Sequence, residues 1–266
     1  MNRPENPARP SGVVPGTLRR VTIAAAVAIV AAMSIPAGGR AETPAAAPPD
    51  RDAVRKIVRE YLLEHPEVIE EAIGVLRARR EAREQDRIGA AIREHDSALR
   101  SHPMSPVSGN PKGDVTLIEF FDYQCGYCKR SLQPVKDLLA ADDRLRIVWK
   151  EFPILGPVSR FAARAGMAAA RQGRYLEYHV AVMGSRGKLT EDRVMALAGR
   201  AGLDVGRLRS DMEDPAIEAY LDETISLART LGIRGTPAFV IGDTLVPGAV
   251  GGDRLKELIA RARSGR

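Results

Sequence analysis

Apolar and polar positions between residues 50 and 76 alternate with the period of amphipathic helices. After Asp50 the apolar positions are Val54, Ile57, Val58, Tyr61 and Leu62, and after His65-Pro66 they are Val68, Ile69, Ala72, Ile73 and Leu76. Proline lacks the N–H group that a helix interior needs, so Pro66 predicts a break between two short helices. Each of these helices has one apolar stripe.

The next segment, residues 77–100, consists almost entirely of charged residues and alanine, with opposite charges four positions apart at Arg77 and Glu81. This composition predicts a solvated helix that serves as a stalk. Two short helices cannot bury both stripes between themselves. We therefore expect residues 42–100 to form a helical oligomerisation region, in which the stripes pack against other copies of the chain. The alternative is that the stripes dock on the rest of their own chain.

The pattern changes after residues 101–112, a predicted linker with three prolines. The run VTLIEFF at 115–121 predicts a buried strand, followed by a helix at 125–140 and a second strand at 145–154. Alanine-rich helical stretches extend over about 157–231. A short apolar run at 238–241, a turn, Leu245-Val246 and a helix at about 252–263 close the chain. This order predicts an α/β domain over residues 113–266 that contains a large helical insertion.

The first 41 residues have the pattern of an export signal. Arginines precede the uncharged run Val21 to Met33, and small residues end at Ala41, where we place cleavage. The run is short for a membrane span, which needs about 20 residues, so a retained anchor is the lesser alternative. Removing residues 1–41 takes away five arginines and Glu5, which lowers the formal charge from +6 to +2. With no concentrated basic face and no phosphate-binding loop, the sequence gives no support for binding of nucleic acid.

The chain has two cysteines, Cys125 and Cys128, at the start of a predicted helix. Residues three apart share one helix face, so the two sulfurs can approach disulfide geometry, and a C-x-x-C after a strand predicts a redox pair. The unpaired N–H groups of the helix start favour a thiolate at Cys125. Cys125 is therefore the expected nucleophile and Cys128 the resolving thiol. A zinc half-site is the alternative, but the four histidines show no ligand spacing.

A second motif, RGTPAFVIGD at 234–243, places Thr236-Pro237 just before a predicted buried strand, where a cis peptide is expected. Together with the C-x-x-C motif, it resembles the thioredoxin fold, and more narrowly the DsbA-like branch with its helical insertion. That resemblance implies that Thr236 and Pro237 face the active-site cysteines and offer backbone groups to an extended substrate. Gly126 and Tyr127, between the cysteines, complete the expected substrate-binding residues.

The segment VRKIVREYLLEHPEVIEEAI, ahead of FFDYQCGYCK, WKEFPILG and GTPAFVIG, is similar to the suppressor-of-copper-sensitivity protein C family of periplasmic thiol oxidoreductases. The resemblance covers nearly all of the chain after residue 41. It implies a periplasmic protein and a homo-oligomer, with a trimer favoured, held by the N-terminal region. It requires no cofactor and no metal.

Glu119 interrupts the apolar strand six residues before Cys125, where a carboxyl group is unfavourable unless it has a partner or a task. In the DsbA-like family an acid at this place accepts a proton near the buried thiol, and the match LIEFF carries that expectation to Glu119. The alternative is a structural salt bridge to Lys150.

The dipeptide Gly126-Tyr127 lacks the histidine that DsbA-type oxidases have between their cysteines, and it is similar to that of periplasmic disulfide isomerases. We therefore predict a disulfide isomerase or reductase that acts on exported proteins with non-native disulfides and receives electrons from a membrane thiol reductase. A dithiol oxidase that uses the same cysteines is the first alternative. A copper-tolerance protein that binds Cu(I) through both thiolates is the second.

Overall fold

The computed structural model describes residues 50–265, and the predicted export signal at 1–41 lies outside them. The chain divides after Val58 into two units. The described part of the first unit is the start of helix α1 (Arg51–Glu64), and everything described below belongs to the second unit. No helix within residues 50–265 has the length and apolar character to cross a membrane.

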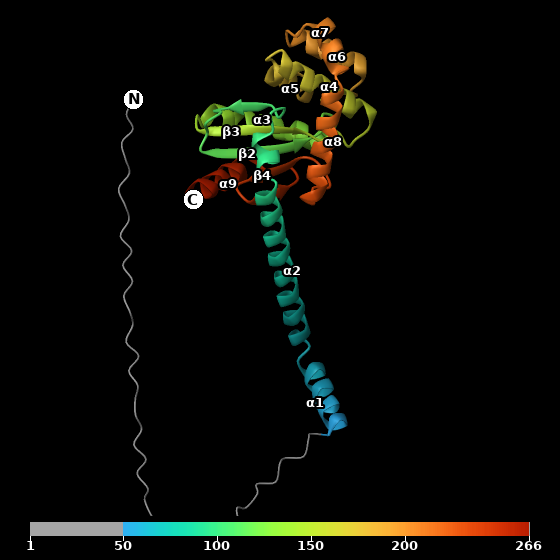
Figure 1. The fold of residues 1–266 in the computed structure, drawn as a ribbon. Coiled ribbons are helices and arrows are strands. Elements are labelled where there is room, and N and C mark those ends of the chain that lie inside the picture. The colour runs from blue at the N-terminus through green and yellow to red at the C-terminus, as the bar shows by residue number, and fades with distance from the viewer. Residues whose placement is uncertain (1–49, 266) are drawn as a thin grey trace, which may run out of the picture. The chain divides into compact units, whose positions relative to one another are not determined.

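A mixed sheet with strand order β1-β3-β2-β4-β5 forms the centre of the second unit (Figure 1). Its strands are β1 (Val107–Gly109), β2 (Val115–Phe121), β3 (Leu145–Glu151), β4 (Ala238–Ile241) and β5 (Thr244–Pro247). Strands β2 and β3 are parallel, and the other neighbours are antiparallel. The bounds of β2 and β4 confirm the strands predicted at 115–121 and 238–241. The prediction succeeded because each strand is an apolar run bounded by polar or turn residues.

The structure differs from the predicted linker at residues 101–112. Strand β1 lies inside that segment and pairs with β3, so the segment is part of the sheet domain. The three-residue strand is too short to show a pattern in the sequence, and the prolines that surround it gave the segment the composition of a linker.

Successive residues of β2 point to opposite faces of the sheet and into two separate cores. Leu117 and Phe121 face the larger core, which α3 and α9 complete together with helices of the insertion. Ile118 and Phe120 face the smaller core, to which the end of α8 contributes Leu227. The helices of the domain are α3 (Gly126–Ala141), α4 (Pro157–Arg171), α5 (Tyr175–Met183), α6 (Glu191–Arg200), α7 (Val205–Met212), α8 (Pro215–Thr230) and α9 (Gly252–Ser264). The predicted α/β domain with a helical insertion is therefore confirmed.

Helix α2 (Glu67–Glu94) starts directly after Pro66, which confirms the predicted break. Its first half exposes the apolar stripe, with Ile73 43% and Leu76 50% accessible. Its last turns differ from the predicted solvated stalk, because Ile88 and Ile92 are buried in the smaller core. A π-helical turn, η1 (Ser97–Ser101), follows and buries Leu99 beside them. The dense charge of residues 77–100 concealed these apolar anchors in the sequence.

We expect Ile92→Ala to lower the free energy of unfolding by about 3 kcal/mol, because it leaves a cavity in a core where Ile92 is fully buried. Leu176→Ala, at a side chain that is 37% exposed, is the control and should cost less than about 1 kcal/mol. Urea unfolding followed by circular dichroism measures both values. Equal losses in the two variants would contradict the packing of the α2 end on the sheet.

Candidate active site

Cys125 lies in the loop that joins β2 to α3, at the edge of the sheet where the parallel strands end. It is the N-cap residue of α3, and its N–H donates to the carbonyl oxygen of Asp122 at 3.0 Å. The Cys125 sulfur accepts a hydrogen bond from the N–H of Cys128 at 3.5 Å. Both cysteines are free thiols and are largely buried. The predicted position of Cys125 at the helix start is thus confirmed.

The peptide bond between Thr236 and Pro237 is cis, as the sequence predicts. The loop that contains it faces the cysteines, and the Cys125 thiol donates to the carbonyl oxygen of Thr236 at 3.2 Å. The fold thereby brings together two motifs that are far apart in the sequence.

Gly126 and Tyr127 lie on the surface beside Cys125. The Tyr127 side chain is 60% exposed, and the guanidinium of Arg130 lies 4.1 Å from the centre of its ring. A methyl group at Gly126 would meet no atom within 4 Å. The first turn of α3 is therefore open to an incoming molecule.

Cys128 and Glu119 are buried, in contrast to the exposed first turn of α3. Burial raises the pKa of the Cys128 thiol far above its ordinary value. Burial, and then the charge that Cys125 carries as a thiolate, raise the pKa of Glu119 to about 8. Glu119 points to the same face of the sheet as Phe121, which is the face covered by α3. The structure thus places Glu119 beneath the cysteine pair.

The alternative salt bridge between Glu119 and Lys150 is wrong. The register pairs Glu119 with Trp149, and Lys150 with Phe120, so Glu119 and Lys150 lie on opposite faces of the sheet. The Lys150 ammonium donates instead to the carbonyl oxygen of Ala98 at 2.6 Å. A strand pattern gives the alternation of faces, but the sequence does not give the pairing register that separates these two residues.

The family model of the DSBA-like thioredoxin domain matches residues 116–260, which is more than half of the chain. The chain belongs to the DsbA-like thioredoxin family. A second family model, the N-terminal domain of the copper resistance protein ScsC, matches residues 50–83. These two matches confirm the predicted thioredoxin-like fold and the resemblance indicated by the N-terminal segment.

Solved structures with this DsbA-like fold cover much of the chain. A thioredoxin-like oxidoreductase from Silicibacter pomeroyi DSS-3 is 47% identical with a TM-score of 0.62, and the match covers 63% of this chain and 97% of that one. BcfH from Salmonella enterica Typhimurium is 32% identical with a TM-score of 0.68, and the match covers 80% of this chain and 95% of that one.

A curated relative is much longer than this chain. The Na⁺/H⁺ antiporter NhaA 1 of Salinispora arenicola is 28% identical over 161 residues, which are 60% of this chain and 25% of the antiporter. The chain therefore spans only about a quarter of the length of that relative.

The DsbA-like domain contains polar residues near the cysteines that the sequence reasoning missed. Asp122 is 1% exposed and binds several donors from the segment after β3. An aspartate just before a cysteine-containing turn has the appearance of an ordinary turn residue. Three of its partners, Ile154, Leu155 and Ser159, lie more than thirty residues further along the chain, at a distance that no local pattern reveals.

A second missed group lies between the sheet and the insertion. The fully buried carboxylate of Glu151 accepts hydrogen bonds from the hydroxyls of Tyr123 at 3.0 Å and Tyr175 at 2.9 Å. Burial raises the pKa of Glu151 well above its ordinary value. Burial also lowers the pKa of the neighbouring His179 to about 3. Gly166 of α4 packs so closely that a methyl group there would lie 2.7 Å from a Glu151 oxygen.

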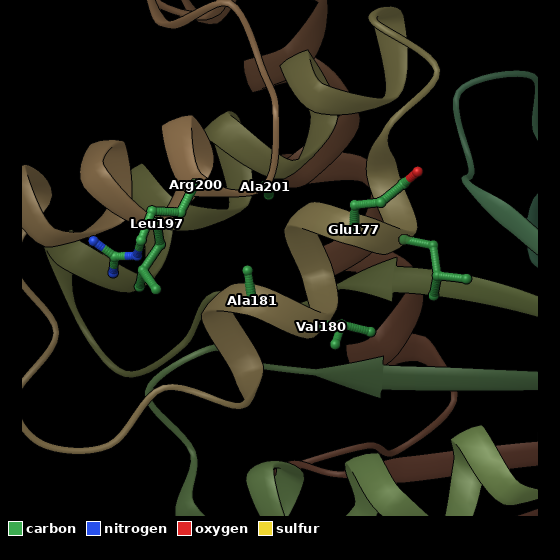
Figure 2. Close-up of a pocket in the computed structure, with 7 residues that line it drawn as sticks. Glu177, Val180, Ala181, Leu197, Arg200 and Ala201 are labelled. Atoms are coloured by element: carbon green, nitrogen blue, oxygen red, sulfur yellow. The ribbon is translucent and has the colours of Figure 1, made fainter.

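Two cavities differ in their relation to the cysteines. One, of about 260 Å³, is lined by the cis-proline loop and by β5, with the residues Gly232, Ile233, Arg234, Gly235, Thr236, Pro237, Ala238, Leu245, Pro247 and Gly248. The other, of about 630 Å³, lies between α5 and α6, and no residue of the cis-proline loop lines it (Figure 2). Within residues 50–265, no group of three or more His, Cys, Asp and Glu side chains is placed to hold a metal ion.

We expect Glu119→Gln to change how stability depends on pH. The carboxyl has an ordinary pKa of 4.5 and a pKa of about 8 in the folded chain. Between these values the folded chain keeps the proton and the unfolded chain loses it, so this group makes the wild-type free energy of unfolding fall as pH rises. Glutamine does not titrate. As pH rises through this range, the free energy of unfolding of the variant should therefore increase relative to that of the wild type by roughly 1.4 kcal/mol per pH unit.

Urea unfolding of the reduced protein at several pH values across this range measures the difference. Glu177→Gln, at an exposed position of α5, is the matched control for the change of residue type. Parallel pH profiles for Glu119→Gln and the wild type would show that Glu119 does not hold its proton in the folded state.

Proposed function

We propose that this protein is a periplasmic thiol–disulfide oxidoreductase that acts as an isomerase or reductase on exported proteins with non-native disulfides. The observation that carries the proposal is the position of the Cys125 sulfur. It lies at the start of α3 and 3.2 Å from the carbonyl oxygen of Thr236 in the cis-proline loop. A substrate strand that pairs with this loop would bring its own sulfur to Cys125.

In the proposed reaction the Cys125 thiolate attacks a substrate disulfide. A mixed disulfide forms between Cys125 and one substrate sulfur, and the other substrate sulfur leaves as a thiolate. For isomerisation, that thiolate attacks another disulfide of the substrate and displaces a second substrate thiolate. A substrate thiolate finally attacks the mixed disulfide, which forms a new substrate disulfide and releases the Cys125 thiolate. For reduction, Cys128 attacks the Cys125 sulfur, which releases the reduced substrate and leaves a Cys125–Cys128 disulfide. A membrane thiol reductase then returns two electrons to the pair.

The resolving step needs a base, because burial strongly disfavours the thiolate form of Cys128 and raises the pKa of its thiol. Glu119 is the candidate for this role, since it is buried on the sheet face covered by α3 and its charge acts on Cys128. Its pKa of about 8 suits a group that takes and returns a proton near neutral pH. In the mixed disulfide Cys125 carries no charge, which removes one of the two causes that raise the pKa of Glu119. The ionised form of Glu119 would then accept the Cys128 proton as the mixed disulfide is resolved.

The two residues between the cysteines bear on whether the pair oxidises its substrates or reduces and rearranges their disulfides. Gly126 and Tyr127 provide no histidine to stabilise the Cys125 thiolate further, and a less stabilised thiolate makes the disulfide a weaker oxidant. The absence of this histidine favours an isomerase or reductase over a dithiol oxidase.

We also propose that the chain forms a homo-oligomer, with a trimer favoured. Ile69, Ile73 and Leu76 on α2 are 43–50% exposed, at the spacing of one helix face. Burying such a stripe against copies of itself would remove apolar surface from water. The match of residues 50–83 to the ScsC N-terminal domain supports this role for the segment.

Substitution of each cysteine tests the reaction. Cys125→Ser should lower the reactivation rate of scrambled ribonuclease at least about 100-fold, because the nucleophile is lost. Cys128→Ser should accumulate a mixed disulfide with the substrate, visible on a non-reducing gel, because no second thiol resolves it. Wild-type activity on reduced ribonuclease, with none on the scrambled form, would instead establish a dithiol oxidase.

A charge placed in the stripe tests the oligomer. Ile73→Lys in the chain after residue 41 should dissociate the assembly, because it would bury an unpaired ammonium group. Gln85→Lys adds the same charge at an exposed polar position of α2 and should leave the assembly intact. Size-exclusion chromatography with light scattering measures the masses. A monomeric wild type, or one mass for all three proteins, would refute the stripe as the interface.

A further inference from the structure

The loop at residues 232–236 joins α8 to the cis-proline and β4. It ends at Thr236, whose carbonyl oxygen accepts from the Cys125 thiol, so the position of the loop sets where this oxygen lies relative to the sulfur. Ile233 is the only buried side chain within residues 232–236. The loop also borders the cavity of about 260 Å³, where packing does not support it. Its position therefore depends on what surrounds Ile233 and on its neighbours at the surface.

The last turns of α2 lie against the beginning of this loop. Ile88 of α2 is buried in the smaller core, and the same core contains Ile233 and Ala238. At the surface, a methyl group at Gly232 would lie 3.4 Å from the Nη2 atom of Arg87. One helix thus contributes an apolar contact beneath the loop and a charged contact beside it.

Glu84 holds the charged contact in place. Its carboxylate accepts from Nε of Arg87 at 2.9 Å and from Nη2 at 2.6 Å, and this two-point pairing fixes the orientation of the guanidinium. The hydrogen bond from Arg87 lowers the pKa of the Glu84 carboxyl, and the charges of Arg87 and Arg234 lower it further. Since this attraction is mutual, Glu84 draws Arg234 toward α2. Arg234 lies two residues before Thr236 in the loop.

We propose that the end of α2 is a positioning element of the active site, which holds the cis-proline loop beside Cys125. Glu84 and Ile88 are the positioning residues, and the Thr236 carbonyl oxygen is the group whose place they set. The proposal rests on the proposed exchange activity. It also gives a second task to the helix that carries the exposed apolar stripe, because α2 runs without a break from Glu67 to Glu94.

A displaced loop would affect two kinds of substrate differently. A polypeptide substrate would pair with the loop through backbone groups, and an error of about 1 Å in such an alignment can lower a rate strongly. A small aromatic disulfide needs only the Cys125 sulfur. The measured quantity is therefore the ratio of kcat/KM for a disulfide-bridged peptide to kcat/KM for the small disulfide. A variant that merely lowers the fraction of folded protein lowers both values and leaves the ratio unchanged.

Ile88→Ala tests the apolar contact. The ratio should fall about tenfold, mainly through the KM of the peptide, because the core that holds Ile233 loses part of its packing. Leu197→Ala is the matched control, since Leu197 is also buried but lies on α6 in the larger core. It should keep the wild-type ratio. Equal falls in the two variants would refute the positioning role of Ile88.

Glu84→Gln tests the charged contact at an exposed position, where the variant is expected to fold. At low salt the ratio should fall about threefold, because Arg87 and Arg234 lose the charge that holds them. In about 1 M salt the variant and the wild type should have equal ratios, because salt screens exposed charges. Glu81→Gln, on the preceding turn of α2, is the control and should keep the wild-type ratio at both salt concentrations. A wild-type ratio in Glu84→Gln at low salt would refute the role of Glu84.

The outcomes separate this proposal from the proposed function. If the wild type exchanges with both disulfides but Ile88→Ala and Glu84→Gln keep its ratio, the positioning role of α2 is refuted and the exchange activity stands. If the wild type exchanges with the small disulfide but not with the peptide, the action on polypeptides is refuted, and the positioning role with it. If it exchanges with neither, both proposals fail.

Discussion

The contact between the Cys125 sulfur and the Thr236 carbonyl is the interaction on which the site depends. It joins the loop after β2 to the loop before β4, at a separation of 111 residues in the sequence. The antiparallel pairing of β2 with β4 fixes where the two loops meet, and the whole helical insertion lies between them in the chain. The insertion can therefore vary without moving the sulfur, as long as the two strands keep their register.

The sequence was most informative where an apolar period or a short motif had only one structural solution. The strand at 115–121, the start of α3 at Cys125 and the cis peptide before Pro237 were predicted correctly, since local pattern and turn chemistry decide them. Strand β1 and the buried Ile92 were missed. Three residues are too few to show a period, and the charge around Ile92 concealed its packing.

The polar residues around the site could not have been found in this way. Asp122 and Glu151 each lie beside an apolar strand pattern, and their partners come from distant helices and loops. The Lys150 alternative for Glu119 failed for the same reason. Opposite charges in adjacent strands look like partners in a sequence, but the register of the parallel pair decides which face each occupies.

Gly166 shows what such a buried polar cluster demands of the rest of the molecule. Its backbone passes the Glu151 carboxylate at a distance that leaves no room for a methyl group, and the Tyr123 hydroxyl lies only 3.0 Å from the place such a group would occupy. A larger amino acid at this position of α4 would be accepted only after strand β3 had lost its acid. At this point the helical insertion and the sheet are therefore coupled, because a side chain at position 166 and the Glu151 carboxylate would compete for the same space.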